Sequence, residues 1–431
     1  MKLLIKSASQ VMQACDQNQI TVTGNEMKNV AILNADNEGL SIAVDNDGNI
    51  AGLGTDSAIT KQFSEESFDH VIDATGCCVL PGLVDAHTHP VWAGDRVHEF
   101  AMKLAGATYM DVHKAGGGIH FTVEHTRKAS QDELSRTFKE RLKRMIKCGT
   151  TLVECKSGYG LDVESELKML RVIEEARRDN SIKIDISTTF CGAHAVPRGK
   201  TSEEATDDVI KRQLPAVREE MEARRLTVDN IDVFCEKSVF DVEQTRRILQ
   251  SGVDMGLMIN FHGDELHPMR AAELGSELKA QAISHLEEIS DDGIKAMAKS
   301  QSVAVILPTT AYILRLRAPP VRKMIDSGVP VALGSDFNPN AFCLSMPTVM
   351  HLACVNFKMS MEEALIATTI NAAAALGKSQ THGSVEVGKR ANLLLVKASR
   401  WEHLVYQFAG HDFTIAAVIC GGEIAYDKQF H

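Results

Sequence analysis

The chain has 431 residues, of which 44% are hydrophobic and 24% charged, so it is long enough to bury one large core and a smaller one. Its formal net charge of −11 argues against a nucleic acid or an anionic membrane as partner, because the field around the chain repels polyanions. A small anionic substrate is not excluded, because a single arginine can still bind it locally.

The start of the chain and its cysteines indicate where the protein resides. The first residues, MKLLIKSASQ, hold an apolar run too short for a secretory signal, and no window approaches a membrane span of about 18 apolar residues. Ten cysteines are scattered without C-x-x-C spacing, and several lie in apolar strand candidates. Buried free thiols in a reducing compartment fit this pattern. We therefore expect a cytoplasmic protein.

Both ends of the chain have the pattern of antiparallel strands. Short apolar segments near the start, such as VAILNA and LSIAVDNDGNIAGLG, are separated by Asn, Asp and Gly turn signals. The end repeats this pattern in GSVEVGKRANLLLV and IAAVICGGEIAY. We expect residues 1–78 and 378–431 to form one composite β-sandwich domain.

Between these ends, in residues 79–377, apolar strand candidates alternate with amphipathic helical segments such as 132–149 and 164–178. The eight strand candidates are residues 78–89, 150–156, 183–194, 230–236, 257–265, 281–288, 302–310 and 330–336. Eight such α/β units most simply close into a (β/α)8 TIM-like barrel. A doubly wound open sheet is the alternative, but no glycine-rich nucleotide fingerprint follows an early strand.

Polar side chains gather where these strand candidates end, which is the edge at which barrel enzymes hold their active sites. They are His87, His89, Lys156, His194, Glu236, His262, Glu265, His285, Thr309, Thr310 and Asp336. Any one of them could be a satisfied core residue. Packing does not explain why apolar strands should end this way throughout, so we expect the active site at this edge.

Four of these residues suit a metal ion. His87 and His89 are two apart, so on a strand their side chains point to one face, although the same spacing also fits a turn with two solvated imidazoles. Together with His262 and Asp336 they could supply three imidazoles and a carboxylate, leaving one position open for water. A metal that activates water and polarises a carbonyl supports hydrolysis.

Two further strand-end residues suit proton transfer. Glu265 lies three residues after His262, and His285 ends the sixth strand candidate. Near activated water they could move protons between water and a leaving nitrogen, as a general acid-base pair. Asp336 could assist this proton transfer. The sequence therefore predicts a metal-dependent hydrolase with Glu265, His285 and Asp336 as its catalytic residues.

Motifs along nearly the whole chain resemble one known superfamily. PGLVDAHTH, HGDE, SHLE and LGSD resemble the amidohydrolase superfamily, whose members hydrolyse C–N and related bonds in a metal-bearing barrel with a composite β-domain. Longer segments are similar to the imidazolonepropionase family within it: DRVHEFAMKLAGATYMDVHKAGGGI, ECKSGYGLD, TFCGAHAVP, DVFCEKSVF and DFNP. That family opens the ring of 4-imidazolone-5-propanoate to N-formimidoyl-L-glutamate in histidine degradation. The resemblance implies this hydrolysis of a cyclic amide.

The resemblance also implies roles for individual residues. His87, His89, His262 and Asp336 match the ligands of one metal ion, which is zinc or iron. Glu265 and His285 match the acid-base residues. The implied substrate contacts are Arg96, Tyr109, Tyr159, His194, Glu265, Asn338, Asn340 and Ala341. Arginine and tyrosine hydroxyls suit the propanoate of the substrate, because they form charge-assisted hydrogen bonds with a carboxylate.

One loop departs from the family pattern, and two further charged residues at strand ends could be taken for metal ligands. Bacterial members have N-P-G followed by Ser or Thr where this chain has NPNA, which leaves the roles of Asn340 and Ala341 open, while Asn338 is expected to keep its contact. Lys156 ends the second strand, whereas a metal-bridging lysine in this superfamily comes from the fourth. Glu236 does end the fourth strand, but we expect it to be hydrogen-bonded behind the ligands.

Two rival functions stay open. Another cyclic amidohydrolase, or an aminohydrolase of the guanine or cytosine type, shares H-x-H, H-x-x-E and the late Asp, but is not expected to need Arg96, Tyr159 and KSGYG together. A catalytically inactive scaffold relative would be expected to lack metal ligands, and this chain lacks none of them. The expected partner is a small molecule with a carboxylate, without nucleic acid or membrane, and the resemblance suggests a homodimer.

Overall fold

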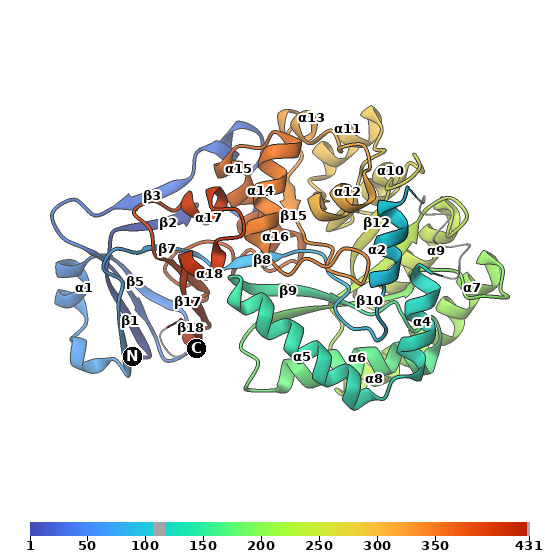
Figure 1. The fold of residues 1–431 in the computed structure, drawn as a ribbon, viewed down its shortest axis with the longest axis horizontal. Helices are drawn as coiled ribbons and strands as arrows, with labels where there is room; N and C mark the ends of the chain where they lie inside the picture. Colours follow the sequence, from blue (N-terminus) through green and yellow to red (C-terminus); the bar gives the residue numbers. More distant parts are fainter. Residues whose placement is uncertain (107–116, 429–431) are drawn as a thin grey trace.

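An eight-stranded parallel sheet forms the centre of the larger lobe (Figure 1). The computed structural model describes residues 1–106 and 117–428, and its barrel strands follow one another in chain order. They are β8 (Leu83–Asp85), β9 (Thr150–Lys156), β10 (Asp185–Ala193), β11 (Asn230–Cys235), β12 (Met258–Gly263), β13 (Ala282–His285), β14 (Val303–Ile306) and β15 (Val331–Leu333). The two ends of the sheet meet just beyond the strands, where Thr88 forms a parallel bridge with Phe337. The predicted barrel is confirmed.

Helices cover the outside of this barrel (Figure 1). In α5 (Gln131–Lys147), Leu134, Phe138, Leu142 and Met145 recur every three or four residues and are buried, which gives the helix one apolar face. The Ser130 side chain accepts a hydrogen bond from the first turn and caps the helix. The other helices of this lobe are α2 (Val97–Leu104), α4 (Ile119–Lys128), α6 (Val163–Arg178), α7 (Ser202–Asp208), η3 (Val209–Gln213), α8 (Leu214–Glu222), α9 (Val242–Val253), α10 (Ala271–Glu277), α11 (Asp291–Ser300), α12 (Pro308–Leu314), α13 (Val321–Asp326), α14 (Met346–Phe357), α15 (Met361–Ala367) and α16 (Ile370–Ala375).

Two further sheets are built from the parts of the chain that flank the barrel: the four-stranded sheet from the N-terminal part alone, and the six-stranded sheet from both parts. The four-stranded sheet has the order β5 (Ile50–Thr55), β4 (Leu40–Val44), β1 (Leu3–Ala8), β6 (His70–Asp73). The six-stranded sheet has the order β18 (Glu423–Asp427), β17 (Ile415–Cys420), β16 (Leu393–Val396), β7 (Cys78–Pro81), β2 (Gln10–Ala14), β3 (Ala31–Asn34). Short helices accompany them: η1 (Gly24–Lys28), α1 (Asp56–Gln62), η2 (Glu65–Ser67), α17 (His403–Tyr406) and α18 (His411–Thr414).

Strand β16 shows why the run LLLV has no polar position. Leu393 and Leu395 are buried in a cluster with Ile5 of the four-stranded sheet. Leu394 and Val396 belong instead to the large cluster that includes the barrel core. Because successive side chains of a strand point to opposite faces, the six-stranded sheet is packed on both sides. The two smaller sheets therefore form the predicted sandwich, and the six-stranded sheet joins it to the barrel.

The apolar run at residues 78–89 is two strands rather than the single barrel strand that we expected. Its first half is β7 of the six-stranded sheet, and its second half contains β8 of the barrel. Gly82 lies between them, where an added Cβ would be 2.2 Å from the Thr151 hydroxyl oxygen. The expectation was wrong because both strands are buried, so polarity does not mark the boundary between them.

The domain boundaries remain a proposal. We infer a composite domain of residues 1–78 and 378–431 and a barrel domain of residues 79–377, although β7 continues to Pro81 in the composite sheet.

All ten cysteines are free, and seven of them are buried, which agrees with the expectation of buried thiols. Within the described ranges, none of the helices is long and apolar enough to cross a membrane.

Candidate active site at the carboxyl end of the barrel

Three imidazoles meet where strands β8 and β12 end. One ring nitrogen from each of His87, His89 and His262 lies within 4.8 Å of the other two, and all three residues are buried. Nε2 of His89 is 3.1 Å from Nε2 of His262, while Nε2 of His87 has no hydrogen-bond partner among the described residues. Because buried lone pairs that converge in this way are costly alone, the three rings suit a cation between them.

Asp336, just past β15, faces the same cluster. Its Oδ1 is 3.6 Å from Nε2 of His87 and 3.7 Å from Nε2 of His89. Its Oδ2 accepts a hydrogen bond from the Thr310 hydroxyl, and its backbone N–H donates to the His87 carbonyl at 2.9 Å. The four ligands expected from the sequence therefore lie together. Three imidazoles and one carboxylate fit a single zinc or iron ion.

Burial keeps the His87 and His89 rings in the neutral form that binds metal. The pKa values of His87 and His89 lie well below the ordinary value because burial disfavours the charged ring, and nearby Lys156 and His194 add repulsion. Burial also raises the pKa of Asp336. Neutral imidazole offers its lone pair to a metal, and a bound cation would favour the ionised Asp336 carboxylate.

Hydrogen bonds behind the cluster orient two of the rings. Nδ1 of His262 is 2.9 Å from Oδ1 of Asp232, and Nδ1 of His87 is 2.8 Å from the Ser284 hydroxyl. Each contact leaves Nε2 facing the cluster. Sequence reasoning missed both partners, although Asp232 had a signal, because it is the only charged residue inside the apolar strand NIDVFC.

Lys156 and Glu236 support the site from behind. The Lys156 ammonium is 2.7 Å from Asp232 and 2.8 Å from Glu154, and all three side chains are wholly buried. Glu236 accepts hydrogen bonds from the Leu266 N–H at 2.9 Å and from the His267 ring at 2.7 Å. These partners occupy both residues, and the hydrogen bonds of Glu236 are of the kind expected for a buried carboxylate.

Glu265 and His285 lie side by side next to the ligands. Oε2 of Glu265 is 3.6 Å from Nε2 of His285, and both residues line one pocket with Asp336. Burial, followed by the neighbouring carboxyl groups of Glu287 and Asp336, raises the pKa of Glu265 well above its ordinary value. Burial lowers the pKa of His285. A carboxyl group with a raised pKa beside an imidazole with a lowered pKa is a pair that can pass one proton between its members.

The same pocket collects most of the expected substrate contacts. Its lining includes Arg96, Tyr159, His194, Glu265, Asn338 and Asn340. Ala341 is not part of the lining: it is buried, and its backbone N–H donates to the Asn338 side chain at 3.1 Å. Tyr109 lies outside the described residues.

Arg96 is fixed in the pocket wall by Glu99, which sequence reasoning missed. Nε and Nη2 of Arg96 donate to the two carboxylate oxygens of Glu99 at 2.9 and 2.7 Å. Glu99 also accepts the Gly118 N–H at 2.8 Å, which ties α2 to the start of α4. The signal available in the sequence was the i, i+3 spacing of Arg and Glu at the start of a helix. The pair presents a rigid guanidinium to the pocket.

The KSGYGL segment forms a loop around one buried carboxylate. Glu166 accepts hydrogen bonds from the backbone N–H groups of Gly158, Gly160 and Leu161 at 3.0, 2.7 and 2.8 Å. Gly158 has a φ of +112°, a conformation that favours glycine. The loop holds Tyr159 in the pocket lining, so the unusual motif is explained by the shape it gives to this wall.

Asn338 shapes the NPNA loop. Its side-chain amide donates to the Asp336 carbonyl at 2.7 Å, and its side-chain oxygen accepts the backbone N–H of Asn340 at 2.6 Å. The Asn340 side chain in turn accepts a hydrogen bond from Lys103 of α2. The loop thus links α2 to the end of the last barrel strand beside the ligand Asp336.

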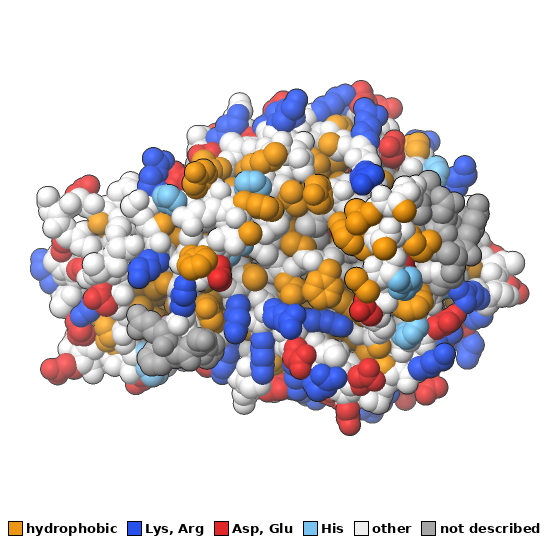
Figure 2. Space-filling model, viewed as in Figure 1, with side chains coloured by type: hydrophobic (Ala, Val, Ile, Leu, Met, Phe, Trp, Pro, Cys, Tyr) orange, Lys and Arg blue, Asp and Glu red, His pale blue; other side chains and the backbone are white. Residues whose placement is uncertain are grey.

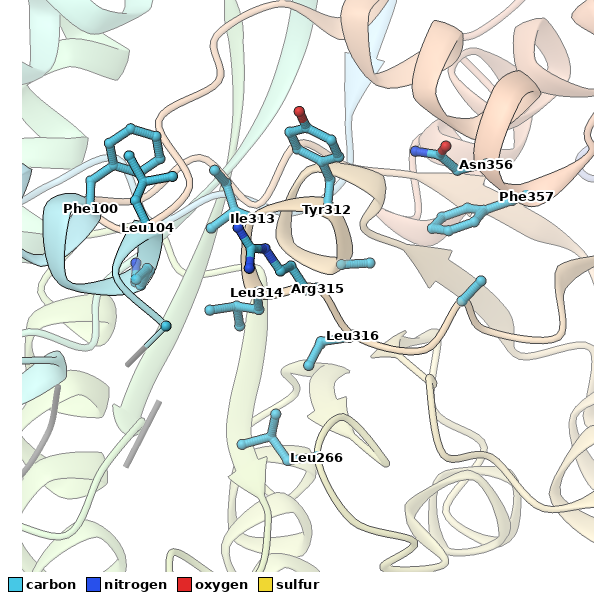
Figure 3. Close-up of a pocket in the computed structure, with 14 residues that line it drawn as sticks. Phe100, Leu104, Leu266, Tyr312, Ile313, Leu314, Arg315, Leu316, Asn356 and Phe357 are labelled. Atoms are coloured by element: carbon cyan, nitrogen blue, oxygen red, sulfur yellow. The ribbon is translucent and has the colours of Figure 1, made fainter. Parts of the chain in front are cut away.

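A wider cavity of about 820 Å³ adjoins the active-site pocket (Figure 3). Phe100 and Leu104 of α2 face the α12 residues Tyr312 and Ile313 across it, and Phe357 lies at its far side. Leu314 lines both this cavity and the active-site pocket, so the two spaces are neighbours. The cavity therefore lies beside the pocket that contains His89 and His262.

The barrel, the composite sheets and the histidine cluster define the class of protein. The model of the amidohydrolase family matches residues 78–425, and the chain belongs to this family. A mouse protein named "Probable imidazolonepropionase" is 63% identical over 427 residues, which are 99% of each chain. A human protein of the same name is 62% identical over 424 residues, 98% of each chain. The crystal structure of an adenosine deaminase from Xanthomonas campestris with bound zinc has a TM-score of 0.74 at 16% identity, over 98% of this chain and 92% of the other, which shows the shared fold.

Proposed function

We propose that the protein is an imidazolonepropionase, which hydrolyses the ring amide of 4-imidazolone-5-propanoate to N-formimidoyl-L-glutamate. The observation that carries the proposal is the identity of 63% with a protein of that name over 99% of both chains. The site supports it, because the candidate metal ligands His89, His262 and Asp336, a proton-transfer pair and a fixed arginine line one pocket. These three features together suit the hydrolysis of a cyclic amide that carries a carboxylate.

Each residue of the site has its own role in the proposed reaction. A metal held by His87, His89, His262 and Asp336 would polarise the ring carbonyl and activate water. Arg96 binds the propanoate, which orients the ring over the cluster. His285 accepts the proton of the attacking water. Glu265 and Asp336 then assist its transfer to the ring nitrogen as the C–N bond breaks.

Replacing either residue of the proton-transfer pair tests the roles proposed for Glu265 and His285. Glu265→Gln or His285→Ala should lower turnover by about 100-fold or more, because each removes a group that holds the proton in the transition state. Metal content should stay at that of the parent protein, since neither residue is among the proposed ligands. Loss of metal from either variant would contradict these roles.

We propose one zinc or iron ion per chain, since nitrogen and oxygen ligands suit both metals. Elemental analysis of the purified protein, followed by removal with a chelator and reconstitution with each metal, measures which ion restores turnover. No bound metal after reconstitution would refute the ligand set.

The substrate is tested against its rivals in one assay. The absorbance of freshly generated imidazolone propanoate is followed in a stopped-flow instrument, beside guanine, cytosine and a hydantoin. Rapid loss of the imidazolone signal with slow or no turnover of the others is expected. Turnover of a rival ring alone would still show a hydrolase but would refute imidazolone propanoate as its substrate.

We propose a small molecule as the partner of this protein, and the free cysteines support a cytoplasmic site of action.

A homodimer is supported by an apolar surface on the face shown in Figure 2. The "apolar face" consists of six large side chains on or beside α12, α14, α17 and α18, each more than half exposed: Tyr312, Phe342, Val355, Tyr406, Phe408 and Phe413. Its rings alone present on the order of 600 Å² of side-chain surface. A patch of this size approaches the contribution of one partner to a standard interface.

A further inference from the structure

Two buried side chains beside the active site lack hydrogen-bond partners among the described residues. They are the ring of His285, at Nδ1, and the carboxyl group of Glu287, at both oxygens. The two side chains are 2% and 1% exposed, and Nδ1 lies 3.8 Å from Oε2. Unsatisfied polar groups at this depth are costly, so three such atoms next to one another need an explanation.

The backbone holds both residues in place at some conformational cost. His285 and Leu286 have φ values of 79° and 69°, which are unfavourable for residues with side chains. The Leu286 N–H donates to the Gly263 carbonyl at 3.1 Å, and the Glu288 N–H donates to the Asp264 carbonyl at 2.8 Å. The turn after β13 is therefore fastened to the end of β12 on both sides of Glu287. Strain that is held in this way is typical of functional sites.

The His285 ring stands between two carboxyl groups. Nε2 is 3.6 Å from Glu265, which lines the pocket, and Nδ1 is 3.8 Å from Glu287, which does not. Burial raises the pKa of Glu287 to about 8, and the neighbouring acidic groups Asp336 and Glu288 add to this shift. Hydrogen bonds of catalytic groups are often long in ligand-free structures and tighten when substrate binds.

We propose that Glu287 is a positioning residue, whose carboxyl group accepts a hydrogen bond from Nδ1–H of His285 and leaves Nε2 unprotonated and directed at Glu265 and the pocket. This role deepens the proposed function, in which His285 accepts a proton from water. That proton binds Nε2 and leaves from Nε2, while Nδ1 keeps its own proton throughout. The positive ring that exists between these two steps favours the ionised form of Glu287, which then stabilises that ring, as a carboxylate does behind a catalytic histidine.

The ring tautomer tests the proposal without any substrate. The zinc-reconstituted protein is prepared with ¹⁵N-labelled histidine, and the His285 signals are assigned from their loss in His285→Gln. The nitrogen shifts should show a protonated Nδ1 and an unprotonated Nε2 in the parent protein. In Glu287→Met, which lacks an acceptor but has a similar volume, the preference for Nδ1–H should disappear. A parent protein with Nδ1 unprotonated, or an unchanged tautomer in Glu287→Met, would overturn the proposal.

Kinetics provide the second test. Glu287→Met should lower kcat by about 100-fold with KM changed by less than about threefold, because the residue touches His285 and not the substrate. Glu287→Gln keeps a neutral acceptor and should lose only about tenfold. Glu288→Gln, one residue along and outside the site, is the matched control and should retain the activity of the parent.

A double variant distinguishes a role of Glu287 in positioning His285 from a general disruption of the active site. His285→Ala with Glu287→Met should be no slower than His285→Ala alone, because Glu287 acts only through that ring. Additive losses would refute the role. If the parent does not hydrolyse imidazolone propanoate, the proposed function fails, whereas the tautomer measurement still decides the role of Glu287.

Discussion

Burial sets the charge of single side chains at this site, and His194 shows the effect most simply. Its Nδ1 is 3.0 Å from the Gly158 carbonyl, which can only accept, so the ring donates from Nδ1. Its ring stacks on that of His89 with centroids 4.5 Å apart and an angle of 10° between the planes. Burial lowers the pKa of His194 to about 3, and neighbouring His262 adds to the shift. His194 therefore stays neutral in the pocket wall.

This shift predicts a pH-dependent contribution to stability. Below its ordinary pKa of 6.5, His194 takes up a proton in the unfolded chain, but in the folded chain only near pH 3. Its stabilising contribution is thus complete above pH 6.5 and is lost as the pH falls towards 3, by about 1.4 kcal/mol per pH unit. Urea unfolding of the metal-free parent and of His194→Asn, compared at several pH values, measures the difference. A difference that does not change with pH would contradict the assignment.

At the scale of elements, the junction between β15 and β8 brings together the side chains proposed as metal ligands. The Asp336 N–H donates to the His87 carbonyl, and the His89 N–H donates to the Phe337 carbonyl, both at 2.9 Å. Gly334 lies at this junction, where an added Cβ would be 2.9 Å from Cβ of His87. The LGSD motif therefore needs glycine because two strand ends approach closely, and the strands carry ligands at that point.

Gly334→Ala should accordingly displace a ligand. We expect about 1–3 kcal/mol of lost stability from the overpacked contact. We also expect about 10- to 100-fold weaker metal binding, because His87 moves relative to its partners. Urea unfolding and competition with a chelator measure the two effects. Gly54→Ala is the matched control: its Cβ would meet nothing closer than 3.7 Å, so stability should change by less than about 0.5 kcal/mol.

At the scale of the whole molecule, the apolar face predicts association of two copies. Replacing Tyr406 and Phe413, which are 74% and 71% exposed, with serine should shift the equilibrium towards monomer. Sedimentation velocity across a range of concentrations measures this shift. Val387→Ser changes a side chain that is 60% exposed outside this face and should leave the distribution unaltered. A parent protein that is monomeric at all concentrations would reject the dimer.

The sequence by itself determined the barrel and most of the candidate site. Side-chain periodicity separates strands from helices, and the polar residue at the end of each apolar strand marks the edge where parallel strands converge. His87, His89, His262 and Asp336 could be brought together on this basis although they are far apart in the chain. The motifs around them identified the family, which the full-length relatives confirm.

Only the tertiary structure decided what lies behind these residues and which strands join which sheet. The division between β7 and β8 was hidden because both are buried, so their sequences look alike. Asp232 and Ser284 contact their histidines across neighbouring strands, and Glu287 meets His285 through a turn with unusual φ values. Periodicity reports which face of an element is buried, whereas such contacts depend on strand register and on backbone conformation, which the three-dimensional packing sets.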